Sequence, residues 1–356
     1  MTSAPFILGI DASRSRSHAP TGVEYYSNQI IQALLELEQP WRVRLYTPAP
    51  LPQFPEKSQR VIPFPRFWSL FRLSLELLLH KPDVLFVPAH VLPFFAPKNS
   101  VVTIHDIAYE RFPKAYGRMA RLYLRWSTRR AVKKARALLV PTEQVKKDLG
   151  DYYGADLEKI HVVHHGPLPL PQSHAKAVRD EKLLFVGRLE HKKNIVGLLE
   201  AWELVQEERP QARLVLAGKP GYGFDAIQEK LRTAKGVESL GYVPEQDLAE
   251  LLGSVRGLVL PSLDEGFGFP LLQAFASDCP VLCSDIPPLR EVGQDAALYA
   301  KDRTALAAGM NLLLDDENLR KNLTAKGRER LKDFSWEKAA KASASILLEN
   351  PLHSAQ

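Results

Sequence analysis

At 356 residues and 45% apolar composition the chain can bury two hydrophobic cores, and its 25% charged residues exclude wholesale disorder. No apolar run approaches the ~18 uninterrupted residues of a membrane span, and the first residues lack the basic region of a signal peptide, so a cytoplasmic protein is expected. Residues 1–170 carry 23 Lys and Arg against 14 Asp and Glu, and the remainder carries 24 against 27. A nucleic acid, an anionic membrane surface or a phosphorylated substrate would each suit this basic first half.

Short apolar runs alternate with helical patterns, which is typical of α/β units on a parallel sheet. In the first half they predict helices over 22–37 and 116–134, and strands at 6–10, 43–46, 84–87, 101–104, 137–140 and 160–163. The proline-rich segment GPLPLP (166–171) and the polar stretch up to 182 then predict a linker.

A second series follows the linker. It predicts strands at 183–186, 213–216, 237–240, 257–260 and 281–283, and helices over 195–206, up to 234, and over 245–252 and 269–276. The fold class is therefore α/β, with two Rossmann-like, doubly wound domains facing a cleft. We expect the domains to span 1–168 and 169–335, and a C-terminal helix within 336–356 to pack back on the first.

The common nucleotide-binding motifs are missing. No G-x-x-x-x-G-K-[ST] supports a P-loop nucleoside triphosphatase, and no G-x-G-x-x-G follows the first strand as in a dinucleotide dehydrogenase. The segment VGRLEHKKN (186–194) follows a predicted strand instead, and its Arg188 and Lys193 would offer a diphosphate two cations beside a helix amino end. A solvated basic turn is the alternative.

A second candidate is LPSLDEGFGFPLLQAFA (260–276), where an acidic, glycine-bearing loop opens a helix. The glycines would let a ligand approach the backbone, and Glu265 could accept hydrogen bonds from vicinal sugar hydroxyls. The alternative is that Glu265 merely caps the helix.

Two loops of the first domain also end predicted strands. His105 and Asp106 lie in TIHDIAYERFP, although a lone histidine after a strand is more often structural than catalytic. Gly22, in HAPTGVEYY, begins a helix whose amino end would face an anion.

Nine segments, in order and at fitting spacing over nearly the whole chain, resemble the GT-B retaining glycosyltransferases of family 4, which include bacterial mannosyltransferases and sucrose-phosphate synthase. They are TGVEYYSNQI, TIHDIAYERFP, PTEQVKKDL, KIHVVHHGP, VGRLEHKKNI, GYVPEQDLAELL, LPSLDEGFGFPLLQA, DIPPLREVGQDAALY and FSWEKAA.

The resemblance implies a role for each matching position. Arg188 and Lys193 would clamp the donor diphosphate, and Gly22 would bring an amide to the distal phosphate. His105 would hydrogen-bond the sugar near its 6-hydroxyl, and Glu265 would hold further hydroxyls. The remaining donor-binding residues would act mainly through their backbone: Gly266, Phe267, Gly268 and, beside Tyr242 at the base, Val243.

One position departs from the family. The motif's second glutamate, which grips the ribose hydroxyls, is Gln273 here. A neutral amide accepts through one oxygen, and neutral hydrogen bonds contribute about 0.5–1.5 kcal/mol against 1.5–3 for charged ones. We therefore expect donor affinity about tenfold lower than with glutamate.

The implied mechanism is retention by front-face displacement. The departing diphosphate takes the proton of the acceptor hydroxyl, so charge stabilisation matters more than a protein nucleophile. There is no Asp-x-Asp pair, and we expect neither a metal ion nor a cofactor; the donor would be a GDP- or UDP-linked sugar.

A basic stretch without Asp or Glu lies between residues 111 and 136. Its basic residues are Arg111, Lys114, Arg118, Arg121, Arg125, Arg129, Arg130, Lys133, Lys134 and Arg136. Upstream, Phe67, Trp68 and Phe71 lie beside Arg66 and Arg72. This mixture suits peripheral docking on an anionic membrane, near a lipid-linked acceptor. The alternative is a solvated helix whose apolar face, including Leu122 and Trp126, completes the core. No recognised module supports nucleic-acid binding.

The leading hypothesis is thus a hexosyltransferase, of mannose or glucose type, acting on a glycan or lipid-linked acceptor. A nucleotide-sugar-binding protein without turnover is the alternative that Gln273 suggests. A sugar-nucleotide epimerase is disfavoured, because its resemblance would not run through EGFGFP in this setting.

Overall fold

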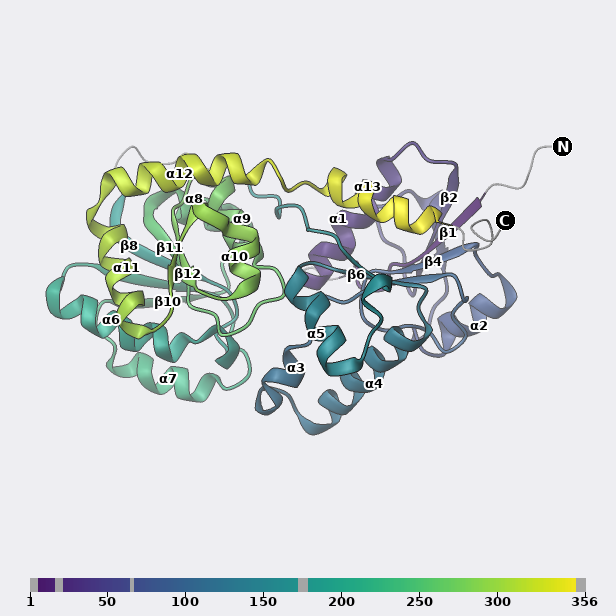
Figure 1. The fold of residues 1–356 in the computed structure, drawn as a ribbon, viewed down its shortest axis with the longest axis horizontal. Helices are drawn as coiled ribbons and strands as arrows, with labels where there is room; N and C mark the ends of the chain where they lie inside the picture. Colours follow the sequence, from purple (N-terminus) through teal and green to yellow (C-terminus); the bar gives the residue numbers. More distant parts are fainter. Residues whose placement is uncertain (1–5, 17–21, 65–66, 172–178, 350–356) are drawn as a thin grey trace. The chain divides into compact units, whose positions relative to one another are not determined.

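The computed structural model describes residues 6–16, 22–64, 67–171 and 179–349. The chain forms two compact units. The first comprises residues 1–110, 117–166 and 335–356, and the second comprises 111–116 and 167–334. Each unit is a parallel sheet with helices packed on it (Figure 1), which confirms the predicted fold class.

The first unit has seven parallel strands in the order β3-β2-β1-β4-β5-β6-β7. Their bounds are β1 Phe6–Asp11, β2 Trp41–Thr47, β3 Gln59–Val61, β4 Val84–Val87, β5 Ser100–Thr103, β6 Ala137–Val140 and β7 Ile160–Val162. The order reverses between β1 and β4. In a doubly wound sheet the carboxyl ends of such a strand pair form a crevice where ligands bind.

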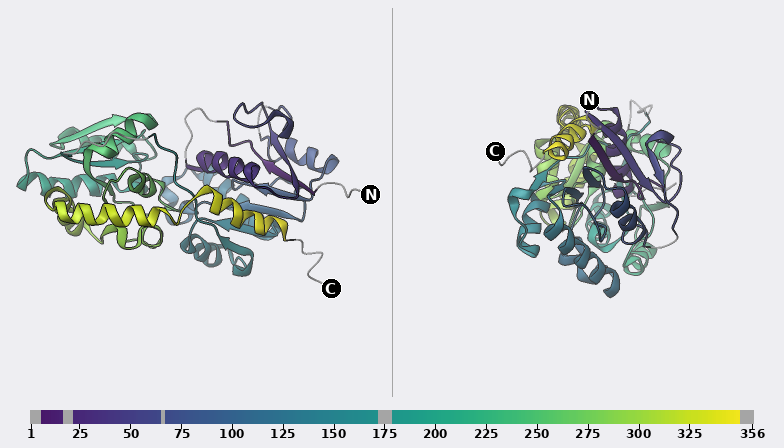
Figure 2. Two further views of the ribbon diagram at one scale, coloured as in Figure 1. Left: turned by 90° about the horizontal axis from the view of Figure 1, so that it is seen from above. Right: turned by 90° about the vertical axis from the view of Figure 1, so that its right-hand side faces the viewer.

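The helices that pack on this sheet come from both ends of the chain. They are α1 Gly22–Glu36, α2 Arg72–Leu79, α3 Ala108–Arg111, α4 Arg118–Lys134, α5 Glu143–Tyr153 and α13 Trp336–Leu348. Helix α13 lies along α1 (Figure 2). Its first turn is capped by Ser335, which accepts a hydrogen bond from the Lys338 amide at 3.0 Å.

The second unit has six parallel strands in the order β10-β9-β8-β11-β12-β13, and here the order reverses between β8 and β11. The strands are β8 Asp180–Val186, β9 Arg213–Ala217, β10 Val237–Gly241, β11 Val255–Leu260, β12 Val281–Ser284 and β13 Ala297–Ala300. Alternate residues enter separate cores: Leu183 and Phe185 pack in one, and Leu184 in the other. The sheet is therefore buried on both faces.

Seven helices accompany this sheet. They are α6 Ile195–Glu208, α7 Phe224–Thr233, α8 Glu245–Ser254, α9 Phe269–Ala276, α10 Pro287–Gly293, α11 Arg303–Asp315 and α12 Glu317–Leu331. Residues of α6, α7 and α11 line one core, and residues of α8, α9 and α10 line the other. Over the described residues, no helix combines the length and the apolar content needed to cross a membrane.

The predicted strands and helices are all present, with ends shifted by a few residues. Two edge strands, β3 and β13, were not predicted. Strand β3 has only three residues, two of them polar, so it carries no apolar run.

Candidate functional site

The predicted donor-binding loops of the second unit follow three strands of one parallel sheet. Val243 follows β10, Arg188 and Lys193 follow β8, and Glu265 follows β11. Since β10, β9, β8 and β11 are neighbours and parallel, their carboxyl ends share one edge of the sheet. The reversal between β8 and β11 places the two charged loops side by side at the position where such sheets bind ligands.

An ion pair joins these two loops. The Lys193 Nζ atom donates to Glu265 Oε1 at 2.5 Å, and the Ser262 hydroxyl donates to the same oxygen at 2.8 Å. The two charged side chains are only 15% and 9% exposed. A backbone hydrogen bond from Leu263 to the Lys192 carbonyl, at 2.9 Å, adds a second link between the loops. The loops therefore form one rigid unit at the strand crossover.

Arg188 differs from Lys193 in having no such partner. Its side chain is exposed, and no carboxylate among the described residues forms an ion pair with it. The backbone beside it is tightly packed, because a Cβ atom on Gly218 would lie 1.8 Å from the Gly187 carbonyl oxygen. Only glycine fits at position 218, and the ends of β8 and β9 are held together behind the Arg188 loop.

The glycine-bearing loop after β11 begins α9 without a side-chain cap. Gly268 is the N-cap residue, with φ 99°, and Glu265 bonds Lys193 and Ser262 instead of the first turn. The alternative role of Glu265 as a helix cap is therefore wrong. The Phe267 ring is buried against Phe269 and Phe334, so that residue can offer a ligand only its backbone. The backbone role expected for Gly266, Phe267 and Gly268 stays a prediction.

Gln273 lies in the second turn of α9 and is 6% exposed. Its side-chain amide hydrogen-bonds no other described residue. The ribose contact expected for Gln273 stays a prediction. Val243 is half-buried on the core, beside the exposed Tyr242 ring, which carries the Lys219 ammonium 4.4 Å from its centroid.

Sequence reasoning missed a second ion pair next to Glu265. The Arg111 guanidinium contacts Asp264 Oδ1 at 2.6 Å, and the Asp264 side chain is 5% exposed. Residues 111–116 belong to the second unit, although their neighbours in sequence belong to the first. Arg111 was counted with the basic stretch, and no local pattern could pair it with a residue 153 positions away.

His105 and Gly22 belong to the first unit. His105 follows β5 and is 8% exposed, with Nε2 2.9 Å from the Pro88 carbonyl oxygen that follows β4. Burial lowers the pKa of His105 to about 4, so its ring is neutral at pH 7. Gly22 begins α1 and is exposed, but residues 17–21 of the same loop lie outside the described residues.

No group of three or more metal-ligating His, Cys, Asp or Glu side chains occurs in the described part of the chain.

Two family models match the chain. A model described as glycosyl transferases group 1 matches residues 169–330, and one described as glycosyltransferase family 4 matches residues 20–166. The chain is 28% identical to O-antigen chain mannosyltransferase B of Escherichia coli, over 89% of this chain and 93% of that protein. It is 27% identical to O-antigen chain mannosyltransferase RfbU of Salmonella typhimurium, over 68% of each.

Solved structures share the fold. WaaG, a glycosyltransferase involved in lipopolysaccharide biosynthesis, matches with a TM-score of 0.73 and 19% identity, over 97% of this chain and all of that one. HepE of Anabaena, crystallised with UDP and glucose, matches with a TM-score of 0.73 and 17% identity, over 98% of this chain and all of that one. At these identities the likeness concerns the GT-B fold alone.

The first prediction concerns the diphosphate clamp. Arg188→Ala and Lys193→Ala should each weaken UDP or GDP binding by about 1.5–3 kcal/mol, because each removes one charged contact. Lys193→Ala should also lower the thermal midpoint, since it leaves the nearly buried Glu265 carboxylate without its cation. Calorimetric titration and thermal unfolding measure the two effects.

Two controls separate binding from folding. Lys182→Ala, at the amino end of β8, should change neither quantity. The double variant Lys193→Ala/Glu265→Gln should recover the thermal midpoint but not the nucleotide affinity. Unchanged affinity in both single variants would remove the clamp from this site.

The second prediction concerns Gln273. Gln273→Glu supplies a charged, two-oxygen acceptor, so donor affinity should rise by up to about tenfold. Repulsion from Glu265 and the diphosphate reduces the gain. Gln246→Glu, on α8, is the charge control. Weaker binding of every nucleotide sugar tested would show that Gln273 does not face the ribose.

Proposed function

Because the chain belongs to the group 1, family 4 glycosyltransferases, we propose that it moves a hexose from a nucleotide diphosphate sugar to a glycan or lipid-linked acceptor, with retention of configuration and without a metal ion. The observation that carries this proposal is the Lys193–Glu265 pair at the β8–β11 crossover, with Arg188 exposed beside it. One small area thus holds cations for a diphosphate and a carboxylate for sugar hydroxyls.

The Lys193–Glu265 pair has a direct consequence for binding. An arriving diphosphate competes with Glu265 for the Lys193 ammonium, which has three donors. Sharing or releasing that contact leaves the carboxylate able to accept from donor-sugar hydroxyls, while Ser262 and the Leu263–Lys192 backbone bond keep the loop in place. Lys193 and Glu265 are therefore ready to bind the ligand, and they neutralise each other when it is absent.

The chemistry follows from this charge arrangement. As the bond between the sugar and the diphosphate breaks, negative charge grows on the leaving phosphate, and Arg188 and Lys193 stabilise it. The acceptor hydroxyl attacks from the same face and passes its proton to a phosphate oxygen. Two protein cations take the part that a metal ion plays in other transferases, so no metal is required.

His105 has one defined tautomer in this proposal. A carbonyl oxygen only accepts, so Nε2 carries the proton towards Pro88 and Nδ1 remains an acceptor. A neutral His105 could thus accept a hydrogen bond from the 6-hydroxyl of the donor sugar. The low pKa of His105 maintains this state throughout the neutral range.

The relatives indicate the identity of the donor sugar more clearly than that of the nucleotide base. Two curated relatives are O-antigen chain mannosyltransferases, which favours a mannose-type hexose and a growing polysaccharide or its lipid-linked precursor as the acceptor. HepE was crystallised with UDP and glucose. UDP- and GDP-linked donors are therefore both to be tested.

We further propose that the protein acts in the cytoplasm on an anionic membrane surface, through α4. The large apolar residues Met119, Leu122 and Trp126 are 79%, 59% and 40% exposed, whereas the buried face of α4 consists of small residues. The alternative, that Leu122 and Trp126 complete the core, is therefore wrong.

The structure also reduces the number of free cations on α4. Arg121 and Arg125 pair with Glu110, and Arg130 donates to backbone carbonyls of residues 92–94. The exposed cations without a carboxylate partner among the described residues are Arg118, Arg129, Lys133 and Lys134. Upstream, Trp68 is buried, Arg72 contacts Glu76 at 3.6 Å, and Arg66 lies outside the described residues.

The third prediction tests turnover. UDP-glucose and GDP-mannose are incubated without acceptor, and nucleotide release is followed by chromatography. Slow hydrolysis of one donor should persist in a chelator and gain little from added manganese or magnesium. Activity lost in chelator and restored by metal would overturn metal independence, and tight donor binding without release or transfer would favour the non-catalytic binder.

The fourth prediction tests the membrane surface. Binding to phosphatidylglycerol vesicles should exceed binding to phosphatidylcholine vesicles and should fall with salt, because exposed charges are screened over about 10 Å at 0.1 M. The variant Arg129→Gln/Lys133→Gln/Lys134→Gln should lose most of the difference, at about 1 kcal/mol per charge. The matched control Arg42→Gln/Lys57→Gln/Lys98→Gln should retain it. Equal binding to both vesicle types would return α4 to an ordinary solvated helix.

A further inference from the structure

Five ring side chains of the first unit, here called the ring cluster, pack against one another. They come from five separate elements: Tyr26 from α1, His90 from the loop after β4, His105 from the loop after β5, His165 from the segment after β7, and Trp336 from the first turn of α13. Tyr26 and His165 are 0% and 1% exposed. The ring cluster therefore connects the C-terminal helix with His105, which lies far earlier in the chain.

Two rings of the cluster set the orientation of the His105 imidazole. The Tyr26 centroid lies 4.7 Å from that of His105, with 77° between the ring planes, and the His165 centroid lies 5.6 Å from it, at 62°. The hydrogen bond from His105 Nε2 to the Pro88 carbonyl, at 2.9 Å, fixes one atom of the ring. The torsion that turns an imidazole plane is broad, so the neighbouring rings must restrain that plane.

The His165 ring is held in turn by Trp336. The two rings are nearly parallel, at 12°, with their centroids 6.1 Å apart. Tyr26 contacts both of them, with centroid distances of 4.4 Å to His165 and 5.9 Å to Trp336. Closely packed interiors transmit displacements from one side chain to the next. A shift of Trp336 would therefore reach His105 through His165 and Tyr26.

Trp336 lies where the chain leaves and re-enters the first unit. The first unit ends at Gly166 and resumes at Ser335. A Cβ atom on Gly166 would lie 2.6 Å from the Trp336 backbone nitrogen and 2.7 Å from its ring, so glycine is needed for this close approach. The two connections to the second unit thus touch each other directly behind the His165 ring.

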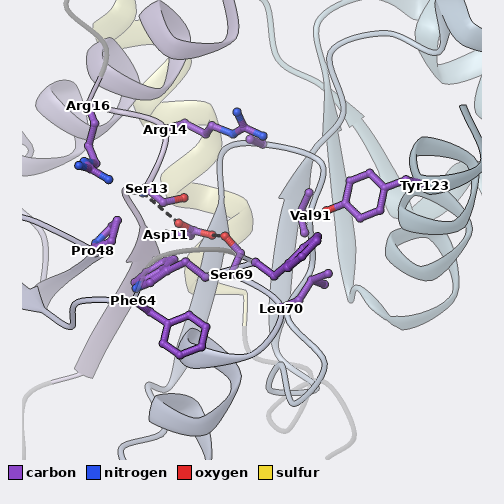
Figure 3. Close-up of a pocket in the computed structure, with 13 residues that line it drawn as sticks. Asp11, Ser13, Arg14, Arg16, Pro48, Phe64, Ser69, Leu70, Val91 and Tyr123 are labelled. Atoms are coloured by element: carbon purple, nitrogen blue, oxygen red, sulfur yellow. Dashed lines mark hydrogen bonds between the residues drawn. The ribbon is translucent and has the colours of Figure 1, made fainter. Parts of the chain in front are cut away.

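All three imidazoles of the ring cluster are neutral at pH 7, because burial lowers the pKa of each. Asp106 opposes this shift at His90 and His105, whereas Arg14 adds to it at His90, and His164 adds to it at the third imidazole. Figure 3 shows Arg14 beside a cavity of about 390 Å³, which the loop containing His90 also lines. The imidazoles therefore pack as neutral aromatic rings.

We propose that Trp336 and His165 are positioning residues for His105. Trp336 holds His165, and His165 together with Tyr26 holds the plane of the His105 ring, so that Nδ1 is presented to the 6-hydroxyl of the donor sugar. The C-terminal helix thereby contributes to sugar selection through His105. This inference rests on the sugar contact proposed for His105 and adds to it the residues on which that contact depends.

The first experiment observes the His105 ring directly, without donor or turnover. Nitrogen NMR of histidine-labelled protein reports which ring nitrogen carries the proton, and His105→Ala identifies the signal. The intact protein should show one tautomer, protonated at Nε2, throughout the neutral range. Trp336→Leu should give a mixture of tautomers and raise the pKa of His105 towards its ordinary value, because the ring loses packing and gains access to water.

Four further variants separate positioning from stability. Trp336→Phe keeps a ring and should keep the single tautomer. Gly166→Ala displaces Trp336 and should reproduce the mixture, whereas Gly117→Ala, where a Cβ atom meets nothing within 4 Å, should not. Leu347→Ala, buried about three turns further along α13, should lower the thermal midpoint without changing the tautomer. A single tautomer in both Trp336→Leu and Gly166→Ala would overturn the proposal.

The second experiment measures sugar selection by calorimetry. It compares GDP-mannose with GDP-6-deoxymannose, and UDP-glucose with UDP-6-deoxyglucose. In one pair the intact protein should bind the donor with the 6-hydroxyl more tightly. Trp336→Leu should reduce this preference at least about threefold, and His105→Ala should do the same. Equal weakening of both donors by Trp336→Leu would show a merely structural role and would overturn the proposal.

The comparison of donors also separates this proposal from the proposed function. A 6-hydroxyl preference that survives unchanged in Trp336→Leu would overturn the positioning role alone. Equal binding of both donors by the intact protein would overturn it together with the His105 contact on which it rests. Binding of no nucleotide sugar would overturn the proposed transferase function as well.

Discussion

Parallel strand pairing with a reversed order beside one central strand is the constraint on which the charged loops of both units depend. A parallel sheet needs a crossover for every connection, so all strands of a unit end at one edge, and loops far apart in the sequence meet there. In the second unit this brings Lys193 and Glu265, 72 positions apart, within hydrogen-bond distance. In the first it brings Ser69 to Asp11, 58 positions away.

The two sheet edges at which the strand order reverses, β1–β4 and β8–β11, differ in how their charged side chains are paired. The β8–β11 edge pairs its acids internally, Glu265 with Lys193 and Asp264 with Arg111, so both carboxylates are compensated. The β1–β4 edge supports its carboxylate with neutral donors and leaves its arginines exposed.

The strands, the helices and the charged loops could be predicted because apolar periodicity and loop composition are local properties. The partners of the loop residues could not. From its position before α9, Glu265 resembles a helix cap. Its partner Lys193 lies in the loop after the neighbouring strand β8, and only the folded sheet brings the two together. The sequence presents Arg121 and Arg125 as unpaired cations of α4. Their partner Glu110 lies on the preceding helix α3, and only the turn between the two helices brings it close to them. The cavity of about 390 Å³ lined by Asp11 was missed because its lining residues come from separate segments of the chain.

The course of the chain also imposes an order on biosynthesis. Helix α13 buries Ala340, Ala344 and Leu347, and it lies along α1, although 299 residues separate the two helices. A ribosome releases α1 early and α13 last, so α1 must wait with its apolar face incompletely covered while the whole second unit is made. The unit whose strands are made first therefore depends for part of its core on a helix that is made after the second unit.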